Sequence, residues 1–286
     1  MQNHDFLPQN LSRGNWTWTP FFTLAFLLGL LAPPAALAQI STWTGGGTQT
    51  PTTGWSQAAN WGGTALASGN ALVFQGSTGL ANGDDIGGAL SVGGLTFASG
   101  AGAFTMGSTS GDSIVLTFAA AITDNSSTSE IISLPITLSA VSQTVHVVGG
   151  GSLTISGLIS GASDGLALSG SGTLTLTGAA AGANTYTGAT SVQGGTLALD
   201  FTQGGSTPVA NIISSSSALT LGGNLAVKSA SGTTAQTFAS MALAGSSQVS
   251  ASGTGVPTVT FGTFTVGTGA NVVFNGPVSP HFSPIY

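Results

Sequence analysis

The acidic side chains are the residues of this 286-residue sequence best suited to chemistry. Glycoside hydrolysis needs two carboxyl groups that face one another across the scissile bond. Asp84 and Asp85 are adjacent and would point to opposite faces of a strand. A turn over Asn82-Gly83-Asp84-Asp85, with the side chains capping the backbone, is favoured. A lone Asp pair supplies few of the six or more oxygens that Ca²⁺ needs, so we predict no metal site. The other acidic residues beyond position 38 are Asp112, Asp124, Glu130, Asp164 and Asp200.

The remaining reactive residue types are also poorly placed for catalysis. His146 would face solvent if Val145 and Val147 are buried, and no acidic neighbour orients it. No Gly-x-Ser-x-Gly element is found on a strand-to-helix turn, and there is no cysteine. A polysaccharide lyase needs cations at the developing enolate, and Lys228 is the one cation beyond the N-terminal segment. We therefore predict that the protein is not an enzyme and binds no cofactor.

Three tryptophans, Trp43, Trp55 and Trp61, are clustered in the sequence and permit two interpretations. Exposed aromatic rings could stack on sugars, which would indicate glycan binding. Buried rings could instead cover the first coil of a repeat fold, whose end otherwise exposes core and strand edges. The covering role is favoured, because large aromatic rings bury much area with few rotatable bonds.

The composition limits the elements that position these residues. Charged residues make up 3% of the chain, against about 25% in a typical soluble domain. Helical folds lack the charged residues that would solvate their outer faces, and 41% hydrophobic content argues against disorder. The net charge of -6, with two basic residues, excludes an electrostatic nucleic-acid interface. The 45 glycines and many hydroxyl residues favour a turn-rich all-β protein.

The N-terminus has the pattern of a secretory signal peptide. Arg13 precedes an apolar run from Phe21 to Leu31, which is followed by Pro33-Pro34 and by the small-residue site Ala36-Leu37-Ala38. We predict cleavage after Ala38 and export of the remainder; an uncleaved membrane anchor is the alternative. Residues 1–38 are then a signal peptide, 39–69 a Trp-rich cap segment and 70–274 a repeat region.

Short alternating segments recur through the repeat region, as in Gly151–Gly157 and Gly172–Gly178. Their inward pairs recur with a period of about 21 residues, which suits one coil of a β-solenoid and is half a propeller blade. A β-sandwich is the competing fold, but its strands recur at about 8–12 residues. We predict about 10 coils of roughly 21 residues each. The inward pairs are Leu72/Phe74, Leu95/Phe97, Ile114/Leu116, Ile132/Leu134, Leu153/Ile155, Leu174/Leu176, Leu197/Leu199, Leu219/Leu221, Met241/Leu243 and Val259/Phe261.

Residues Leu168 to Leu199 resemble the passenger-associated transport repeat, also called the autotransporter-associated β-strand repeat. The resemblance rests on a Gly-Ser-Gly-Thr-Leu-x-Leu strand, an Asn-Thr-Tyr-Thr-Gly turn and a second Gly-Thr-Leu-x-Leu strand. The insertion Ala179–Gly182 departs from the pattern, and Leu168-Ser169 stands where the family often has Lys. The segments Thr42–Gly45 and Asn70–Phe74 resemble the start of large exported repeat proteins. The matching repeat positions are Gly170, Gly172, Leu174, Leu176, Asn184, Tyr186, Gly188, Gly195, Leu197 and Leu199.

The resemblance implies a right-handed parallel β-helix passenger at the surface of a Gram-negative-type cell. Such passengers usually precede a translocating β-barrel, whereas the segment after Phe274 is a short Pro-rich tail, residues 275–286. We therefore expect either a fragment or a separate outer-membrane translocator as partner. The function we predict is an exported, non-catalytic scaffold or adhesin fragment. The alternative is a β-helix that binds or processes carbohydrate, with surface glycans as partners.

Overall fold

The computed structural model describes residues 39–47, 53–108, 111–117, 121–139, 142–178, 184–203, 210–230, 232–276 and 279–282. All of them belong to Leu37–Tyr286, one of the two units into which the chain divides. The predicted signal peptide with its cleavage site after Ala38, and the insertion Ala179–Gly182, lie outside the described residues.

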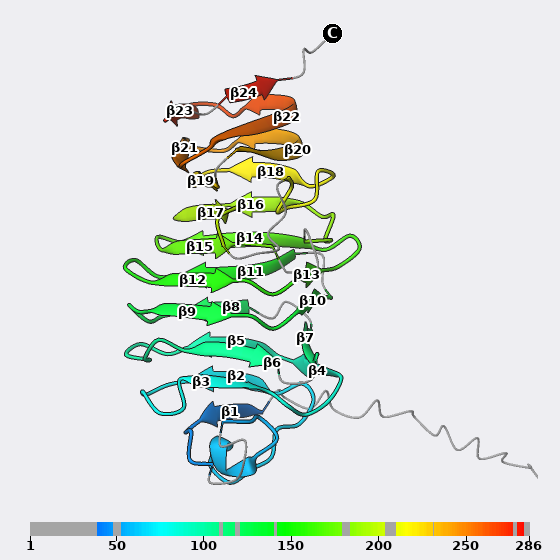
Figure 1. The fold of residues 1–286 in the computed structure, drawn as a ribbon, viewed down its shortest axis with the longest axis vertical. Helices are drawn as coiled ribbons and strands as arrows, with labels where there is room; N and C mark the ends of the chain where they lie inside the picture. The colour runs from blue at the N-terminus through cyan, green and yellow to red at the C-terminus, as the bar shows by residue number, and fades with distance from the viewer. Residues whose placement is uncertain are drawn as a thin grey trace, which may run out of the picture. The chain divides into compact units, whose positions relative to one another are not determined.

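Alternation of apolar and polar residues builds short strands, each paired in parallel with strands one coil away. In Figure 1 these strands lie one above the next from β1 to β24. The largest sheet, sheet A, has eleven strands within the described residues. They are β1 (Ile40–Trp43), β2 (Ala71–Phe74), β5 (Gly94–Phe97), β8 (Ala121–Asp124), β11 (Ser142–Val147), β14 (Gly165–Gly170), β16 (Thr190–Val192), β18 (Ala218–Leu221), β20 (Thr233–Leu243), β22 (Val256–Val266) and β24 (Ser279–Phe282).

Two further sheets supply the other sides of the coils. Sheet B has nine strands and sheet C four, counted over the described parts of the chain. The strands of sheet B are β3 (Ala81–Asp84), β6 (Thr105–Ser108), β9 (Ser129–Ile132), β12 (Ser152–Ile155), β15 (Thr173–Leu176), β17 (Thr196–Asp200), β19 (Asn224–Ser229), β21 (Ser246–Gly253) and β23 (Asn271–Asn275). The strands of sheet C are β4 (Ala89–Val92), β7 (Ser113–Leu116), β10 (Ile136–Leu138) and β13 (Ile159–Ser160).

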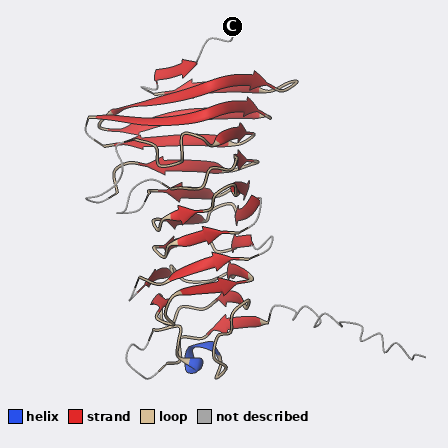
Figure 2. Cartoon of the chain, turned by 90° about the vertical axis from the view of Figure 1, so that its right-hand side faces the viewer, coloured by secondary structure: helices blue, strands red, loops and turns tan. Residues whose placement is uncertain are grey.

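Helix is almost absent from the described residues, as Figure 2 shows. A single 3₁₀ turn, η1 (Ala58–Trp61), ends at Gly62, whose φ of 67° is the left-handed conformation that glycine adopts most easily. No helix in the described ranges is long and apolar enough to cross a membrane.

The inward face of the coils forms one continuous hydrophobic core. All the residues that the alternation assigns to this face, from Leu72 to Phe261, are buried. The prediction of the inward face is therefore confirmed. The reason is that period-two alternation directly reports which side of a strand faces away from water.

The ten inward pairs do not form one ladder, and this part of the prediction is wrong. Leu72 stacks on Leu95 in sheet A, and Leu153 stacks on Leu174 in sheet B. Ile114 lies in sheet C, where it pairs with Ile136. Alternation identifies the face of a strand but not the sheet to which the strand belongs, so strands of three sheets were counted as one series.

The number of coils is correspondingly lower than predicted. Along sheet A the inward residues Leu95, Ile122, Val145 and Leu168 follow one another, and each step is longer than the predicted period. Between β2 and β22, the sheet A strands that bound the predicted repeat region, the solenoid makes about eight turns instead of ten. The coils are longer than expected because some turns between their strands contain additional residues, as between Val192 and its partner Leu221. The fold class, an all-β parallel solenoid, is confirmed, and its right-handed sense stays a prediction.

Candidate functional site

The repeat-like segment occupies the same position of the solenoid in two consecutive coils. Leu174 and Leu176 of β15 pair with Leu197 and Leu199 of β17 in sheet B. All four side chains are buried. The Gly-Thr-Leu element that occurs twice in the sequence is thus one structural unit, in which each leucine stacks on its equivalent.

Four glycines of this segment lie where neighbouring coils approach closely. Gly170 and Gly195 have φ values of +88° and +64°, which disfavour any side chain. A Cβ atom at Gly172 or at Gly188 would collide with a backbone oxygen of the preceding coil. These glycines therefore set the spacing between coils, and no ligand role is needed to explain them.

Asn184 joins coils through its side-chain amide. Its Oδ1 accepts a hydrogen bond from the Ile159 N–H at 2.8 Å, and its Nδ2 donates to the Ile212 carbonyl oxygen at 3.0 Å. The residue is 2% exposed. Among the described strands, sheet C ends at β13, which contains Ile159. The amide thus continues hydrogen bonding between coils at the point where this strand pairing stops.

Tyr186 is buried at one end of a chain of hydroxyl contacts. Its hydroxyl lies 3.0 Å from Thr190 Oγ1, which lies 3.0 Å from Ser217 Oγ. Ser217 Oγ donates to the Gly188 carbonyl oxygen at 2.7 Å. Burial raises the pKa of Tyr186, so the phenol stays neutral. The Asn-Thr-Tyr-Thr-Gly turn is thereby held by buried hydrogen bonds.

The three tryptophans lie in the core of the first coil. Trp43 and Trp55 are 0% exposed and Trp61 is 4% exposed. Trp61 packs edge-on against Trp43 at 5.1 Å and against Phe74 at 5.6 Å between ring centroids. The indole N–H groups donate to the Thr78 carbonyl, the Asn82 amide and the Trp55 carbonyl. This burial supports the covering role and leaves no ring face exposed for a sugar.

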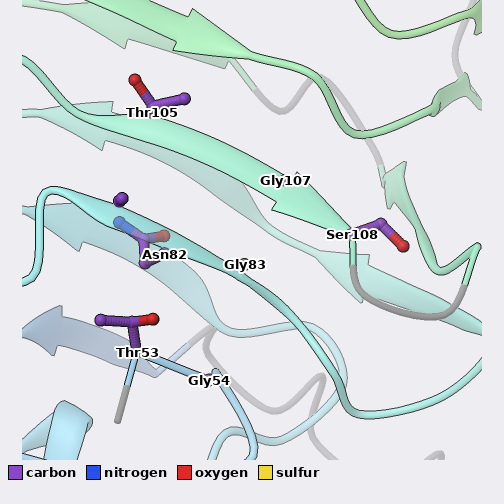
Figure 3. Close-up of a pocket in the computed structure, with 8 residues that line it drawn as sticks. Thr53, Gly54, Asn82, Gly83, Thr105, Gly107 and Ser108 are labelled. Carbon is purple, nitrogen blue, oxygen red and sulfur yellow. The ribbon is translucent and has the colours of Figure 1, made fainter. Parts of the chain in front are cut away.

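A groove of about 270 Å³ lies beside this first coil on sheet B (Figure 3). Its floor is a column of three glycines, because Gly54 pairs with Gly83 and Gly83 with Gly107. None of its described lining residues is charged. The sequence analysis missed this groove, although the glycines at the same register could have indicated it. The other lining residues are Thr53, Ala81, Asn82, Thr105 and Ser108.

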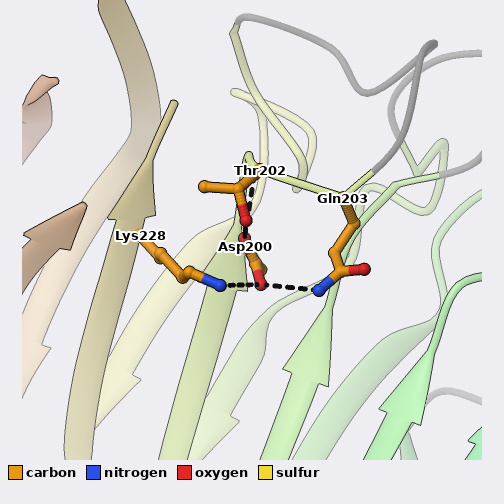
Figure 4. A network of polar contacts seen from close by, with 4 residues as sticks. All are labelled: Asp200, Thr202, Gln203 and Lys228. Atoms are coloured by element: carbon orange, nitrogen blue, oxygen red, sulfur yellow. Dashed lines mark hydrogen bonds and ion pairs between the residues drawn. The ribbon is translucent and has the colours of Figure 1, made fainter. Parts of the chain in front are cut away.

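Asp200 and Lys228 form an ion pair at the end of β17 (Figure 4). Lys228 Nζ and Gln203 Nε2 each lie 3.1 Å from Asp200 Oδ2, and the Thr202 hydroxyl donates to Oδ1. Burial acts to raise the pKa of Asp200, but the hydrogen bonds from Thr202, Gln203 and Lys228 hold it below its ordinary value. With both its oxygens engaged, this carboxylate ends a strand and anchors the turn.

Asp84 and Asp85 do cap the backbone as predicted, but Asp84 lies in strand β3 and is fully buried. Its Oδ1 accepts the Ile86 N–H, and burial raises its pKa. Asp85 accepts hydrogen bonds from both the N–H and the hydroxyl of Ser56. The two side chains serve different contacts and do not form a facing catalytic pair.

Asp124 and Glu130 occupy inward positions, which the sequence analysis missed. Both are 0% exposed. Asp124 is in phase with the buried Ile122, and Glu130 is in phase with the buried Ile132, so the alternation contained the signal. His146, by contrast, lies between two buried valines on the outer face, as predicted, with Nδ1 3.0 Å from Ser169 Oγ.

No group of three or more His, Cys, Asp or Glu side chains suited to a metal ion occurs in the described residues. The fold and these sites define a parallel β-solenoid whose polar contacts mainly join its own coils. Within it, residues 166–199 match the passenger-associated-transport-repeat family, which confirms the resemblance for that segment. No curated protein and no solved structure matches the chain.

Proposed function

We propose that this chain is an exported, non-catalytic scaffold of the passenger type, displayed at a cell surface or released from it. The observation that carries the proposal is the passenger-associated repeat at residues 166–199, which is built into a continuous solenoid. The residues of this repeat account for the stacking of the coils. Its leucines stack on their equivalents, its glycines allow neighbouring coils to approach closely, and the Asn184 amide bonds to both adjacent coils.

The distribution of reactive groups supports a scaffold over an enzyme. Asp84 and Asp85 engage separate partners, and Asp200 is held by Thr202, Gln203 and Lys228. The outer face of sheet B carries mostly small neutral side chains such as Thr154, Thr175 and Ala198, which pair in register. Such a surface suits a stiff spacer whose hydroxyl groups are in contact with water.

Export through the predicted signal peptide and a separate translocator completes this proposal. The test is expression of the full chain with a C-terminal epitope tag, followed by cell fractionation and protease digestion of intact cells. The scaffold proposal expects loss of residues 1–38 and a protease-accessible tag when the translocator is present. A matched chain lacking residues 1–38 should stay inside the cell. If the full chain keeps residues 1–38 and stays in the cytoplasm, as the shortened chain does, export is contradicted.

The groove over Gly54, Gly83 and Gly107 supports a second candidate function, carbohydrate binding. Its uncharged floor and its hydroxyl rim, from Thr53, Thr105 and Ser108, suit a neutral sugar. Gly107→Leu is a sharp test, because no described atom lies within 4 Å of a Cβ placed there. Glycan-array binding by the full chain that Gly107→Leu abolishes, without loss of stability, would favour this function. Absence of binding would favour the scaffold.

A further inference from the structure

The turn between sheets A and B in the fourth coil contains a buried acidic pair. Asp124 ends β8 and Glu130 lies in β9, and both are 0% exposed. Asp124 occupies the inward position that Phe97 holds in the coil before and Val147 in the coil after. Glu130 pairs with the buried Leu153. Two carboxyl groups thus replace apolar residues in a core position.

The hydroxyl groups around this pair have too few protons for their contacts. Ser126 Oγ lies 2.8 Å from Asp124 Oδ1 and 2.5 Å from Glu130 Oε1. Thr128 Oγ1 lies 2.8 Å from Glu130 Oε1 and 3.1 Å from the Ala101 carbonyl oxygen. Each hydroxyl carries one proton, whereas carbonyl and ionised carboxylate oxygens only accept. Asp124 Oδ1 also accepts a hydrogen bond from the Ser126 N–H at 3.0 Å. The two hydroxyl protons still cannot fill all four short hydroxyl contacts to acceptor oxygens, so a proton on one carboxyl group supplies a further donor.

The outer oxygens of the pair support the same conclusion. Asp124 Oδ2 and Glu130 Oε2 are buried and have no hydrogen-bond partner in the described part of the chain. Two ionised carboxylates with unsatisfied oxygens in a dry position would carry a large desolvation cost and would repel one another. Neutralising one of them removes most of both penalties.

We propose that Asp124 and Glu130 share one proton in the folded protein. Together with Ser126 and Thr128 they form an acid-stabilised latch that joins sheet A to sheet B. The proton passes between Glu130 Oε1 and Asp124 Oδ1 through the Ser126 hydroxyl. As one O–H bond forms another breaks, and no other atom is transferred. The latch makes this coil of the solenoid tighter in acidic than in neutral surroundings.

No other charged group among the described neighbours compensates the pair. Strands β5, β6 and β12, which pack against β8 and β9, contain no ionisable side chain. Strand β11 contributes His146, which lies on the outer face beside Ser169. Burial and the two carboxyl groups therefore raise the pKa values of the pair, whereas the hydrogen bonds from Ser126, Thr128 and the Phe104 backbone act to lower them.

The direction of the pH effect follows from the linkage between protonation and folding. Burial raises the pKa of Asp124 and of Glu130, and repulsion from Asp124 adds to the effect on Glu130. The folded chain keeps a proton that the unfolded chain has released. The stabilisation is complete below the unfolded pKa values, 3.8 and 4.5, and is lost as the pH rises through the folded values.

The test compares thermal unfolding of the full chain with that of Glu130→Gln, and with Asp164→Asn as a control outside the latch, between about pH 4 and about pH 8. At the upper pH, Glu130→Gln should melt at least about 3 °C above the unsubstituted chain, and the gap should close at the lower pH. Asp164→Asn should follow the unsubstituted chain. Infrared spectroscopy should show a protonated carboxyl band that Glu130→Gln removes.

Parallel melting curves for Glu130→Gln and the unsubstituted chain, or lower melting of Glu130→Gln at every pH, would overturn the proposal. Calcium chloride that raises the melting temperature of the unsubstituted chain at about pH 8, but not that of Glu130→Gln, would also overturn it in favour of a cation site. If Glu130→Gln does not fold, Asp124→Asn is read against the same criteria, since it removes the other half of the pair.

Discussion

The first coils and the middle coils bury different side chains on the same sheets. Around Trp55, Phe74 and Phe97 the core is aromatic, and Asp124 and Glu130 replace apolar residues in the fourth coil. Strands β11 to β16 contain no carboxylate, and their core is built from aliphatic stacks such as Leu153 on Leu174. The sheets continue through both regions. The alternation of apolar and polar residues therefore determines which side chains face the core. The type of the inward residue, aromatic, acidic or aliphatic, then differs from coil to coil.

The largest expected effect lies in the aliphatic region. Leu176→Asp should destabilise the solenoid by roughly 4 kcal/mol or more, because it would bury a carboxylate between the apolar side chains of Ile155 and Leu199. Thr175→Asp, on the outer face of the same strand, should cost much less. Urea denaturation followed by circular dichroism measures both. Equal losses would mean that Leu176 is not an inward position of this strand.

Trp55→Ala should be the most damaging change in the aromatic coils, at about 3–5 kcal/mol. It removes a fully buried ring and leaves the Asn82 Oδ1 atom without its indole donor. Trp55→Phe, which keeps a ring, is the matched control and should lose less. Unchanged stability with loss of glycan binding would instead assign the tryptophan to a ligand.

Asn184→Ala should destabilise the middle coils by about 1–3 kcal/mol, since it leaves the Ile159 N–H without its side-chain acceptor. Thr185→Ala changes an exposed side chain of the same turn and is the control. Chemical denaturation of both variants gives the difference. A loss no larger for Asn184→Ala than for Thr185→Ala would show that the amide does not join the coils.

Lys228→Gln should have the smallest effect, below about 1 kcal/mol, because the lysine side chain is 49% exposed. The pKa of Asp200 lies below its ordinary value, so the stabilisation from this group is present at neutral pH and is lost as the pH falls. The sign is opposite to that expected for Asp124 and Glu130. Melting curves in low and high salt should show that the Lys228 contribution is screened.

The sequence permits a correct prediction of the inward face but not of the sheets. Residues such as Leu95, Leu153 and Leu219 are all buried as expected. Their assignment to sheets A and B could not be made, because the lengths of the turns decide it and alternation carries no information on them. The long step from Val192 to its partner Leu221 in the next coil is an example.

The polar core could be predicted only in part. Asp124 is in phase with Ile122, but a carboxylate at an inward position normally argues for a turn. Ser126 and Thr128, whose hydroxyls contact Asp124 and Glu130, are near in the sequence, but the direction of their side chains depends on the conformation of the turn. The glycine groove depends likewise on the pairing of Gly54 with Gly83 across coils. Such features need the register, which the sequence does not provide.

The pairing of each strand with strands one coil away has a kinetic consequence. Leu168 meets Val145 and Val192 in sheet A, and no strand pairing in the described residues reaches beyond the adjacent coil. Once a first coil has formed, each later one finds its template already in place, so ordering can propagate along the chain in one direction. If such a chain crosses a membrane unfolded, the free energy released as each coil forms on the far side would favour its forward movement.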